Sequence, residues 1–438
     1  MQFVCQLHFY VAVVGPCLLD FQEIVHTDTQ HIGVIFTGRS IGYLVGSLIG
    51  GTLFDFTERK QLFMTVLNFL IAISMCAIPW SRTIEMLTGW LLVTGLLMGA
   101  LDTGLNAGCL NLWGKESGPF YPALHFMYGF GSLLAPLIVA PFLGDYHHET
   151  FTNGTSSYRN ETLLQHPLDY SFNSTNKSDS FEIPPLTYAY SIIGGIGFLV
   201  SISFLVVCTI APLEVGINKN ETTEIKQRSY IFVTIIVILT FPLLFVITGL
   251  EAGYAQMLAT YSVKGPPHLT PVIGSYLTST FWGAFTISSF FCIFFAIKYS
   301  SLTIIIFDLI VFSAGTVVLL FLATTREWAL WLATVLLGMG FASLYASVIS
   351  WVERYINITN KIIGILATGG ALGEMAIPYT ISYFLEKTPE VLSYIVTASC
   401  VFSILLTAIL YLIFINKQEK YVEKKAIPNA TFDIDYIE

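Results

Sequence analysis

Long apolar stretches recur along the whole chain and constrain its fold more than any other feature of the sequence. Each is about 20 residues long, the helical length that crosses a hydrocarbon core of about 30 Å. Lipid supplies no hydrogen-bond partners, so a segment that crosses it must be helical. Charged residues make up only 11% of the 438 residues, too few for the surface of a soluble protein. We therefore predict an all-α membrane protein. Its twelve spans are expected at residues 3–25, 31–53, 61–79, 86–110, 120–143, 187–211, 229–260, 270–297, 302–322, 328–352, 361–385 and 390–415.

The remaining composition excludes several classes of protein. The net charge is −9, and no basic stripe is present to neutralise nucleic-acid phosphates. Nearly all of the seven cysteines lie in the apolar stretches, without the spacing of a disulfide framework or a metal site. A GxxxxGK[ST] loop, a nucleophile elbow and a zinc motif are absent from the sequence. We therefore expect a protein that is not an enzyme and needs no cofactor; without an ATP-binding loop, any work that it does across the membrane must draw on ion gradients.

The two halves of the chain repeat a glycine pattern at a shift of about 241 residues. Glycine is common in membrane helices, but matches in three pairs of predicted helices indicate a duplication. Parallel six-helix repeats of this kind bind their substrate between the halves. We expect two pseudo-symmetric six-helix bundles, at 1–212 and 229–415, with a linker at 213–228 and a tail at 416–438. The matched residues are Gly33 with Gly274, Gly42 with Gly283, Gly99 with Gly340, Gly131 with Gly373, and Pro136 with Pro378.

Two independent signals orient the chain across the membrane. Cytoplasmic loops of membrane proteins carry an excess of Lys and Arg. With the N-terminus inside, the inner loops and tail hold thirteen of these residues and the outer loops hold six. The polar loop at 144–186 then lies outside, with four acceptor sequons for glycosylation. We predict a plasma-membrane protein with both termini in the cytoplasm. The sequons are at Asn153, Asn160, Asn173 and Asn176.

Ionisable residues inside the predicted spans mark candidate functional positions, because an ionised side chain costs about 2.5–3.5 kcal/mol at the bilayer centre. Asp102 and Asn106 lie one helical turn apart on one face, which suits a cation or sugar hydroxyls. Asp20 follows Gly15-Pro16, where proline frees a backbone carbonyl that could help the carboxylate to hold Na⁺. An interfacial capping role for Asp20 is equally open.

The second half carries two further acids in glycine-rich stretches. Glu251 lies between two glycines, which leave room for a ligand, and Tyr254 and Gln256 could bind its hydroxyls. Glu374 has Pro378 one turn further on, a pattern typical of a helix that bends during alternating access. A structural ion pair remains the alternative for each of these acids.

Three other ionisable groups lie within predicted spans. Arg39 shares a helix face with several glycines, so we expect it to lie on a packed face and neutralise one of the acids. His125 is predicted as a second partner of buried charge, although a lone histidine is more often structural. Asp308 belongs to a peripheral span, where a structural role is favoured.

The turn after the second span carries a family signature. It reads Gly51-Thr52-Leu53-Phe54-Asp55-Phe56-Thr57-Glu58-Arg59-Lys60. This segment resembles the motif between helices two and three of the major facilitator superfamily. Phe56 stands where the family usually has a basic residue, and Glu58 where it has glycine. The resemblance implies the two-bundle fold of that superfamily and a cytoplasmic gate that includes Asp55 and Arg59.

Six further segments match one branch of that superfamily. They read Gly38-Arg39-Ser40-Ile41-Gly42-Tyr43, Leu101-Asp102-Thr103-Gly104-Leu105-Asn106, Ala123-Leu124-His125-Phe126, Phe281-Trp282-Gly283, Ile349-Ser350-Trp351-Val352-Glu353-Arg354-Tyr355 and Gly370-Ala371-Leu372-Gly373-Glu374-Met375-Ala376-Ile377-Pro378. Together they resemble the sodium-dependent glucose transporter group, also called major facilitator domain-containing protein 4 and related to fucose–proton symporters. The resemblance spans nearly the whole chain outside the 144–186 loop and the tail.

The resemblance implies hexose uptake coupled to Na⁺ or H⁺, with Asp20 and Asp102 at the coupling positions. The group usually has an arginine soon after the tryptophan of its Phe-Trp-Gly motif. This chain has Ser288-Ser289 there, so its second half lacks that intramembrane cation. We therefore expect any coupling machinery to lie mainly in the first half.

These residues together predict a monomeric cation–sugar symporter that works by alternating access. Two alternatives remain open. A passive facilitator of sugars or another small polar solute would need no coupling acid, and a non-transporting sensor or receptor would bind a ligand without flux. In the leading hypothesis Trp282 stacks on the pyranose ring. The sugar site is then lined by Asn106, Glu251, Tyr254, Gln256, Trp282 and Glu374.

Overall fold

The computed structural model of the chain is helical throughout the regular structure that it describes. The described residues are 2–57, 59–113, 120–144, 183–210, 229–415 and 417, and at 2–5, 55, 106–113, 120–125 and 360 only the backbone is described. The predicted linker, nearly all of the tail and the four sequons lie outside these ranges. Their predicted roles therefore stay predictions.

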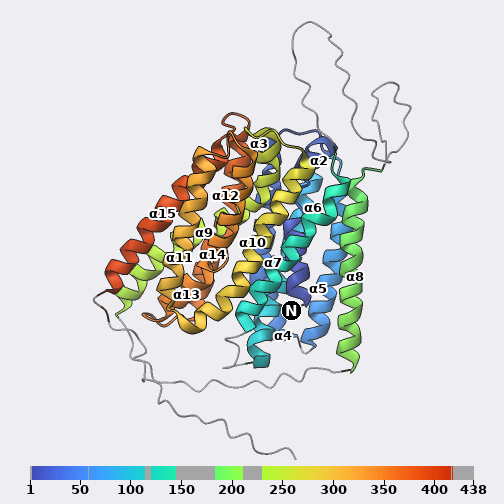
Figure 1. Cartoon of the computed structure of the whole chain (residues 1–438). Coiled ribbons are helices and arrows are strands. Elements are labelled where there is room, and N and C mark those ends of the chain that lie inside the picture. The colour runs from blue at the N-terminus through green and yellow to red at the C-terminus, as the bar shows by residue number, and fades with distance from the viewer. Residues whose placement is uncertain are drawn as a thin grey trace, which may run out of the picture.

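The N-terminal half packs as one group of helices, coloured blue to green in Figure 1. Within it α4 packs along α6, α5 along α8, and α1 along α7. Its elements are α1 (Gln2–Ala12), α2 (Leu18–Ile24), α3 (Thr29–Ile32), α4 (Val34–Phe56), α5 (Lys60–Ala77), η1 (Ile78–Trp80), α6 (Ile84–Trp113), α7 (Phe120–Val139), η3 (Ala140–Phe142) and α8 (Leu186–Ile210).

The C-terminal half forms a second group beside the first, coloured from yellow-green to red (Figure 1). Within it α9 packs along α14, α11 along α12, and α10 against both α9 and α12. The halves meet where α7 packs on α10 and where α4 and α3 pack on α14. Its elements are α9 (Tyr230–Lys264), α10 (Pro271–Lys298), α11 (Ser301–Phe321), α12 (Glu327–Phe341), α13 (Leu344–Glu353), α14 (Asn360–Leu385) and α15 (Val391–Phe414).

Every predicted span contains helix, and in the described part ten helices are long and apolar enough to cross a membrane. The first span is broken between α1 and α2 at Gly15-Pro16, where the sequence predicted local unwinding. The fifth is a shorter apolar helix over Phe126–Phe142 in the part described with side chains. The tenth is also broken, at Ala342-Ser343, which the sequence analysis did not predict.

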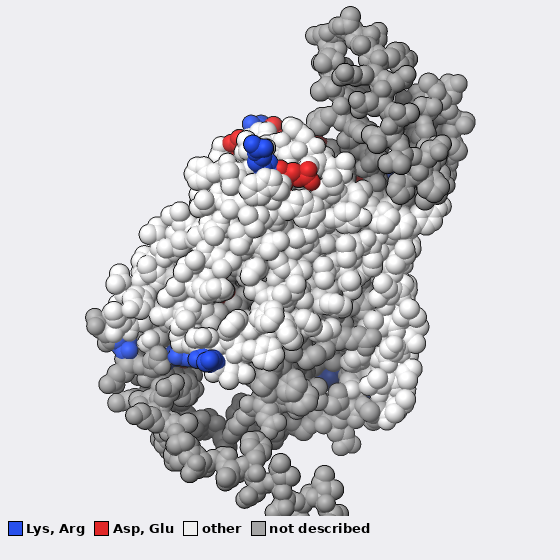
Figure 2. All heavy atoms as spheres, in the orientation of Figure 1, with Lys and Arg blue, Asp and Glu red and all other residues white. Residues whose placement is uncertain are grey.

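Charged side chains gather at the two ends of the visible face, and an uncharged band lies between them (Figure 2). This is the distribution that a bilayer requires, because ionised groups are disfavoured in hydrocarbon. We call the end at which α7 ends and α8 begins the loop side. The end at which α8 ends and α9 begins is called the linker side.

Glycines set how closely α4 and α6 approach. A Cβ atom on Gly46 would lie 1.9 Å from the carbonyl oxygen of Leu96, and one on Gly99 would lie 2.1 Å from that of Tyr43. Real Cβ atoms do not approach this closely, so the two backbones touch only because side chains are missing there. The packed glycine face that the sequence predicted for the helix of Arg39 is present. It turns Arg39 and Tyr43 toward the centre of the molecule.

Candidate functional site

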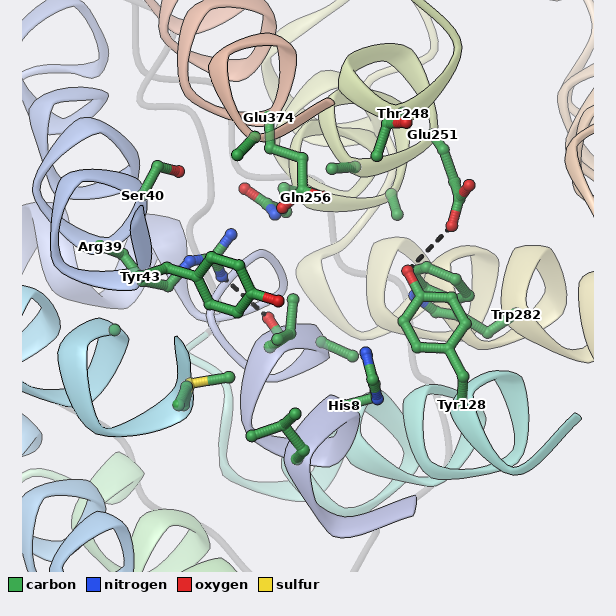
Figure 3. Close-up of a pocket in the computed structure, with 18 residues that line it drawn as sticks. His8, Arg39, Ser40, Tyr43, Tyr128, Thr248, Glu251, Gln256, Trp282 and Glu374 are labelled. Atoms are coloured by element: carbon green, nitrogen blue, oxygen red, sulfur yellow. Dashed lines mark hydrogen bonds between the residues drawn. The ribbon is translucent and has the colours of Figure 1, made fainter. Parts of the chain in front are cut away.

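A cavity lies between the two halves and is lined by both of them (Figure 3). Helices α1, α4, α6 and α7 supply one part of its wall, and α9, α10 and α14 supply the other. Its volume is about 80 Å³, whereas pockets for small molecules usually hold roughly 300–1,000 Å³. The halves must therefore separate further to admit a sugar. The polar lining residues are His8, Arg39, Ser40, Tyr43, Tyr128, Thr248, Glu251, Gln256, Trp282 and Glu374.

One stripe of α9 forms much of the C-terminal wall. Thr248, Glu251 and Gln256 belong to this stripe together with two small alanines, at the spacing that puts residues on one helix face. Tyr254 does not belong to it, and this corrects its predicted role in the sugar site. The Tyr254 side chain is fully buried inside the C-terminal half, with its hydroxyl 2.9 Å from that of Thr334.

Arg39 and Glu374 face the cavity from opposite halves (Figure 3). Arg39 is only 5% exposed and donates a hydrogen bond to the Val11 carbonyl oxygen at 3.4 Å. Its charge acts on the Glu374 carboxylate, which is its acidic counterpart in the cavity. Arg39 forms no ion pair with the described side chains, so its neutralisation of Glu374 stays a prediction.

Glu251 is held by a residue that the sequence analysis missed. The hydroxyl of Tyr128, on α7, donates a hydrogen bond to Glu251 Oε1 at 2.8 Å, and this bond joins the two halves. The ring of Tyr128 also meets the ring of His8 edge-on, with centroids 3.9 Å apart. Both Tyr128 and His8 line the cavity. Their only sequence signal was a polar side chain within an apolar span.

Three polar side chains of the C-terminal wall have atoms that are buried without hydrogen-bond partners among the described residues. They are the Thr248 hydroxyl, both amide atoms of Gln256 and the indole N–H of Trp282. Buried polar groups are normally paired, so unpaired ones that line a cavity point to a ligand. Gln256 and Trp282 were predicted from the sequence to bind the substrate, and the structure places both at the cavity.

The two acids predicted to bind the coupling ion do not lie together. Asp102 accepts a hydrogen bond of 2.7 Å from Tyr43, on the cavity wall, and lies about 27 Å along α6 from its loop-side start at Ile84. Asp20 accepts a bond of 3.0 Å from the backbone N–H of Gly144, at the loop side. A single ion cannot bind both, because carboxylate ligands lie within about 2.6 Å of a bound cation.

Other predicted site residues are only partly described. The side chains of Asn106, His125 and Asp55 lie outside the described residues, although their backbones are helical. Arg59 is exposed on the linker side and forms no ion pair with the described side chains. The predicted cytoplasmic gate therefore stays a prediction.

The serines that replace the expected arginine have structural partners at the break between α12 and α13. Ser288 and Ser289 donate hydrogen bonds of 3.3 Å to the carbonyl oxygens of Met339 and Ala342. Ser343, at the same break, donates a hydrogen bond to the buried carboxylate of Asp308. Asp308 is therefore tied to the helix break outside the cavity lining, in line with the structural role favoured from sequence.

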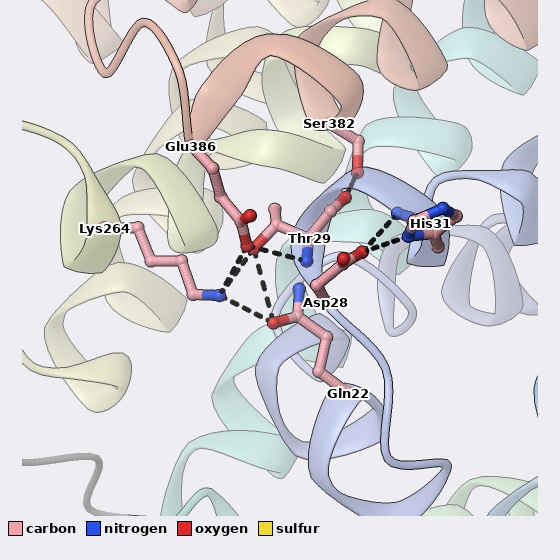
Figure 4. Close-up of polar contacts among 7 residues, drawn as sticks. All are labelled: Gln22, Asp28, Thr29, His31, Lys264, Ser382 and Glu386. Atoms are coloured by element: carbon pink, nitrogen blue, oxygen red, sulfur yellow. Dashed lines mark hydrogen bonds and ion pairs between the residues drawn. The ribbon is translucent and has the colours of Figure 1, made fainter.

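A cluster of polar contacts joins the halves above the cavity, on the loop side (Figure 4). Lys264, at the end of α9, lies 2.8 Å from Gln22 Oε1, 2.5 Å from the Thr29 hydroxyl and 3.7 Å from Glu386. The Thr29 backbone N–H donates a hydrogen bond of 2.9 Å to the Glu386 carboxylate. The Thr29 carbonyl oxygen accepts a hydrogen bond of 2.5 Å from the Ser382 hydroxyl. We call these five residues the loop-side contact. It links α9 and α14 of the C-terminal half to α2 and α3 of the N-terminal half, so we expect it to oppose separation of the halves on this side.

Removal of the Lys264 charge, as in Lys264→Met, is expected to open the loop side more often. Because Lys264 is 29% and Glu386 41% exposed, we expect a modest effect of about 1 kcal/mol, or about fivefold in population. The measurement uses Ala255→Cys, which places a thiol in the cavity lining of a chain without its native cysteines. The population that is open on the loop side is then given by the rate at which an impermeant thiol reagent, added from that side, labels this cysteine.

Lys387→Met is the matched control for this change. Lys387 lies over the ring of Tyr383 in its own half, so the variant removes a nearby charge without touching the loop-side contact. Its labelling rate should equal that of the parent. Equal rates for Lys264→Met and the parent would contradict the closing role of the loop-side contact.

Comparison with known proteins assigns the family. The sequence pattern described as Major Facilitator Superfamily matches residues 3–378 of the chain. The chain belongs to the major facilitator superfamily. The predicted all-α transporter fold is thereby confirmed, as is the prediction that the protein is not an enzyme.

Named relatives of this superfamily member are also transporters. Sodium-dependent glucose transporter 1 of Danio rerio is 31% identical over 408 residues, covering 92% of this chain and 66% of that protein. The protein of the same name from Xenopus laevis is 30% identical over 422 residues, covering 94% of this chain and 80% of that protein. The chain thus spans about two thirds of the Danio rerio relative.

A solved structure shares the fold of this superfamily member. The crystal structure of the nucleoside transporter NupG superposes with a TM-score of 0.62 and covers 95% of this chain and 98% of the NupG chain. The two sequences are 12% identical, so the likeness concerns the fold alone.

Proposed function

We propose that this transporter is a secondary active symporter of glucose or a related hexose with Na⁺ or H⁺. The observation that carries the proposal is the cavity between the halves, where Arg39 and Glu374 face each other beside buried polar groups without partners. Sugar hydroxyls both donate and accept hydrogen bonds, so they suit the Gln256 amide, the Trp282 indole N–H and a carboxylate. The names of the relatives, sodium-dependent glucose transporter 1, support the same substrate class.

Transport would proceed by alternating access of the cavity to the two sides. In this proposal the loop side faces the outside, the loop-side contact closes it, and both termini lie in the cytoplasm of a plasma-membrane protein. The predicted gate of Asp55 and Arg59 would close the linker side in turn. One chain supplies both walls of the cavity, so a monomer is sufficient.

The proposal is tested by flux into proteoliposomes that contain the full chain. We expect labelled glucose or another hexose in a panel of sugars and nucleosides to accumulate under an imposed Na⁺ or H⁺ gradient. Equilibration without accumulation would favour the passive facilitator. Binding without flux would favour the sensor, and accumulation of nucleosides alone would overturn the hexose assignment.

Gln256→Ala and Trp282→Ala are expected to weaken sugar binding. Each removes a donor that the sugar would pair, which costs about 1–2 kcal/mol, or roughly fivefold to thirtyfold in KM. The measurement is the KM of zero-trans uptake. Tyr254→Phe is the matched control, because it removes a hydroxyl from α9 outside the cavity. A KM unchanged in both cavity variants would remove these residues from the site.

A further inference from the structure

Glu251 joins a titratable group to the interface that must open during transport. Its side chain is 7% exposed, and its hydrogen-bond donor, Tyr128, belongs to the other half. A carboxylate accepts such a bond more strongly than a neutral acid does. The charge on Glu251 therefore affects how firmly α7 is held to α9.

The cavity holds more buried acid than buried base. The charge of Arg39 acts on Glu374 and Tyr128, while the described interactions of the Glu251 carboxylate are with Tyr128 and with the like charge of Glu374. One guanidinium cannot neutralise two buried carboxylates, and neighbouring carboxylates in one site tend to share a proton. The other titratable groups that line the cavity with Glu251 come from four helices: His8 from α1, Arg39 and Tyr43 from α4, Tyr128 from α7 and Glu374 from α14. Helices α10, α13 and α15 add no titratable group to the lining.

The surplus charge calls for a small cation at Glu251. A proton needs only the one carboxylate, and Tyr128 can keep its bond to Oε1 while the proton lies on the other oxygen. The arrangement therefore favours a proton over Na⁺ at this position.

We propose that Glu251 carries the coupling proton, an inference that rests on the hexose symport proposed above. A proton from the solution on one side binds the carboxylate and gives the neutral acid, and the same proton leaves to the solution on the other side. Uptake weakens the bond from Tyr128 and so loosens the link between the halves, and release restores it. One proton then crosses in each cycle.

The test uses the full chain in proteoliposomes loaded with the transported hexose. Glu251→Gln is expected to keep hexose counterflow exchange, because exchange needs no net proton movement. It should lose accumulation driven by a pH gradient, by about tenfold or more, because an amide cannot take up the proton. Asp308→Asn, which changes a buried acid outside the cavity, should accumulate hexose as the parent does.

Tyr128→Phe is a second variant that tests the same proposal and retains Glu251. It can be used if Glu251→Gln does not fold. Loss of the donor disfavours the ionised carboxylate. The midpoint of uptake against pH should therefore move to higher pH, which a purely structural role of Tyr128 would not cause. Tyr254→Phe, which removes a hydroxyl outside the cavity, should leave that midpoint in place.

Four results would overturn the inference. They are accumulation by Glu251→Gln under a pH gradient, accumulation by the parent under a Na⁺ gradient alone, loss of coupling in Asp102→Asn instead of Glu251→Gln, and hexose counterflow in the parent without any coupling, which would leave hexose binding in place. Absence of hexose counterflow in the parent would overturn the proposed function itself.

Discussion

Arg39→Met is expected to reduce hexose uptake about one hundredfold to one thousandfold. The arginine is buried in the cavity wall and is the cation that acts on Glu374. Its removal leaves Glu251 and Glu374 in the cavity without a nearby guanidinium, and an uncompensated buried charge costs about 3–5 kcal/mol. The measurement is the initial rate of labelled hexose uptake, corrected for the amount of protein at the cell surface.

The double variant Arg39→Met/Glu374→Gln separates charge balance from a direct role of the arginine. Removing both partners relieves the unpaired charge, so the double variant should transport better than Arg39→Met alone. Arg39→Lys keeps the positive charge but lacks the planar guanidinium. Its rate of uptake should therefore lie between the rates of the single and the double variant. A double variant no better than the single one would show that the arginine acts by binding the substrate directly. Normal uptake by Arg39→Met would contradict any role for the pair.

The helical fold could be predicted because lipid offers no hydrogen-bond partners, so the backbone of a spanning segment must pair its polar groups within a helix. Part of the site could be predicted for a related reason. A charged or amide side chain in an apolar helix needs a partner or a ligand, and this singled out Arg39, Glu251, Gln256 and Glu374. All four line the cavity. Which of them face each other could not be read from the sequence, because that depends on how two separate bundles meet.

The errors have physical causes of the same kind. Tyr254 lies three residues after Glu251, a spacing that allows both to share a face of α9, yet the Tyr254 side chain is buried inside the C-terminal half with its hydroxyl 2.9 Å from that of Thr334. Tyr128 carries no charge, and its role comes from an acid 123 residues away. Lys264 was counted only as a loop charge, yet it bonds Gln22 across 242 residues. Such contacts depend on the packing of the halves, which no local pattern encodes.

Gly46→Val is expected to abolish the folded protein. Even the first added carbon would lie 1.9 Å from the Leu96 carbonyl oxygen, which is backbone and cannot turn aside. Helices α4 and α6 would have to separate along their whole contact, and with them Arg39 and Tyr43 would leave the cavity wall. Overpacking a core usually costs about 1–3 kcal/mol, and more where backbone must move. Loss of the monodisperse peak in detergent gel filtration, together with loss of surface expression, measures the effect.

Gly89→Val is the matched control, because a Cβ atom added at this position of α6 meets nothing within 4 Å. It should leave expression and uptake close to those of the parent. Gly46→Ala gives an intermediate step, since it adds only the single clashing carbon. It should lower the midpoint of thermal unfolding without removing the folded protein. If Gly46→Val and Gly89→Val behaved alike, the close approach of α4 and α6 would not position the cavity wall, and the assignment of Arg39 to it would fail as well.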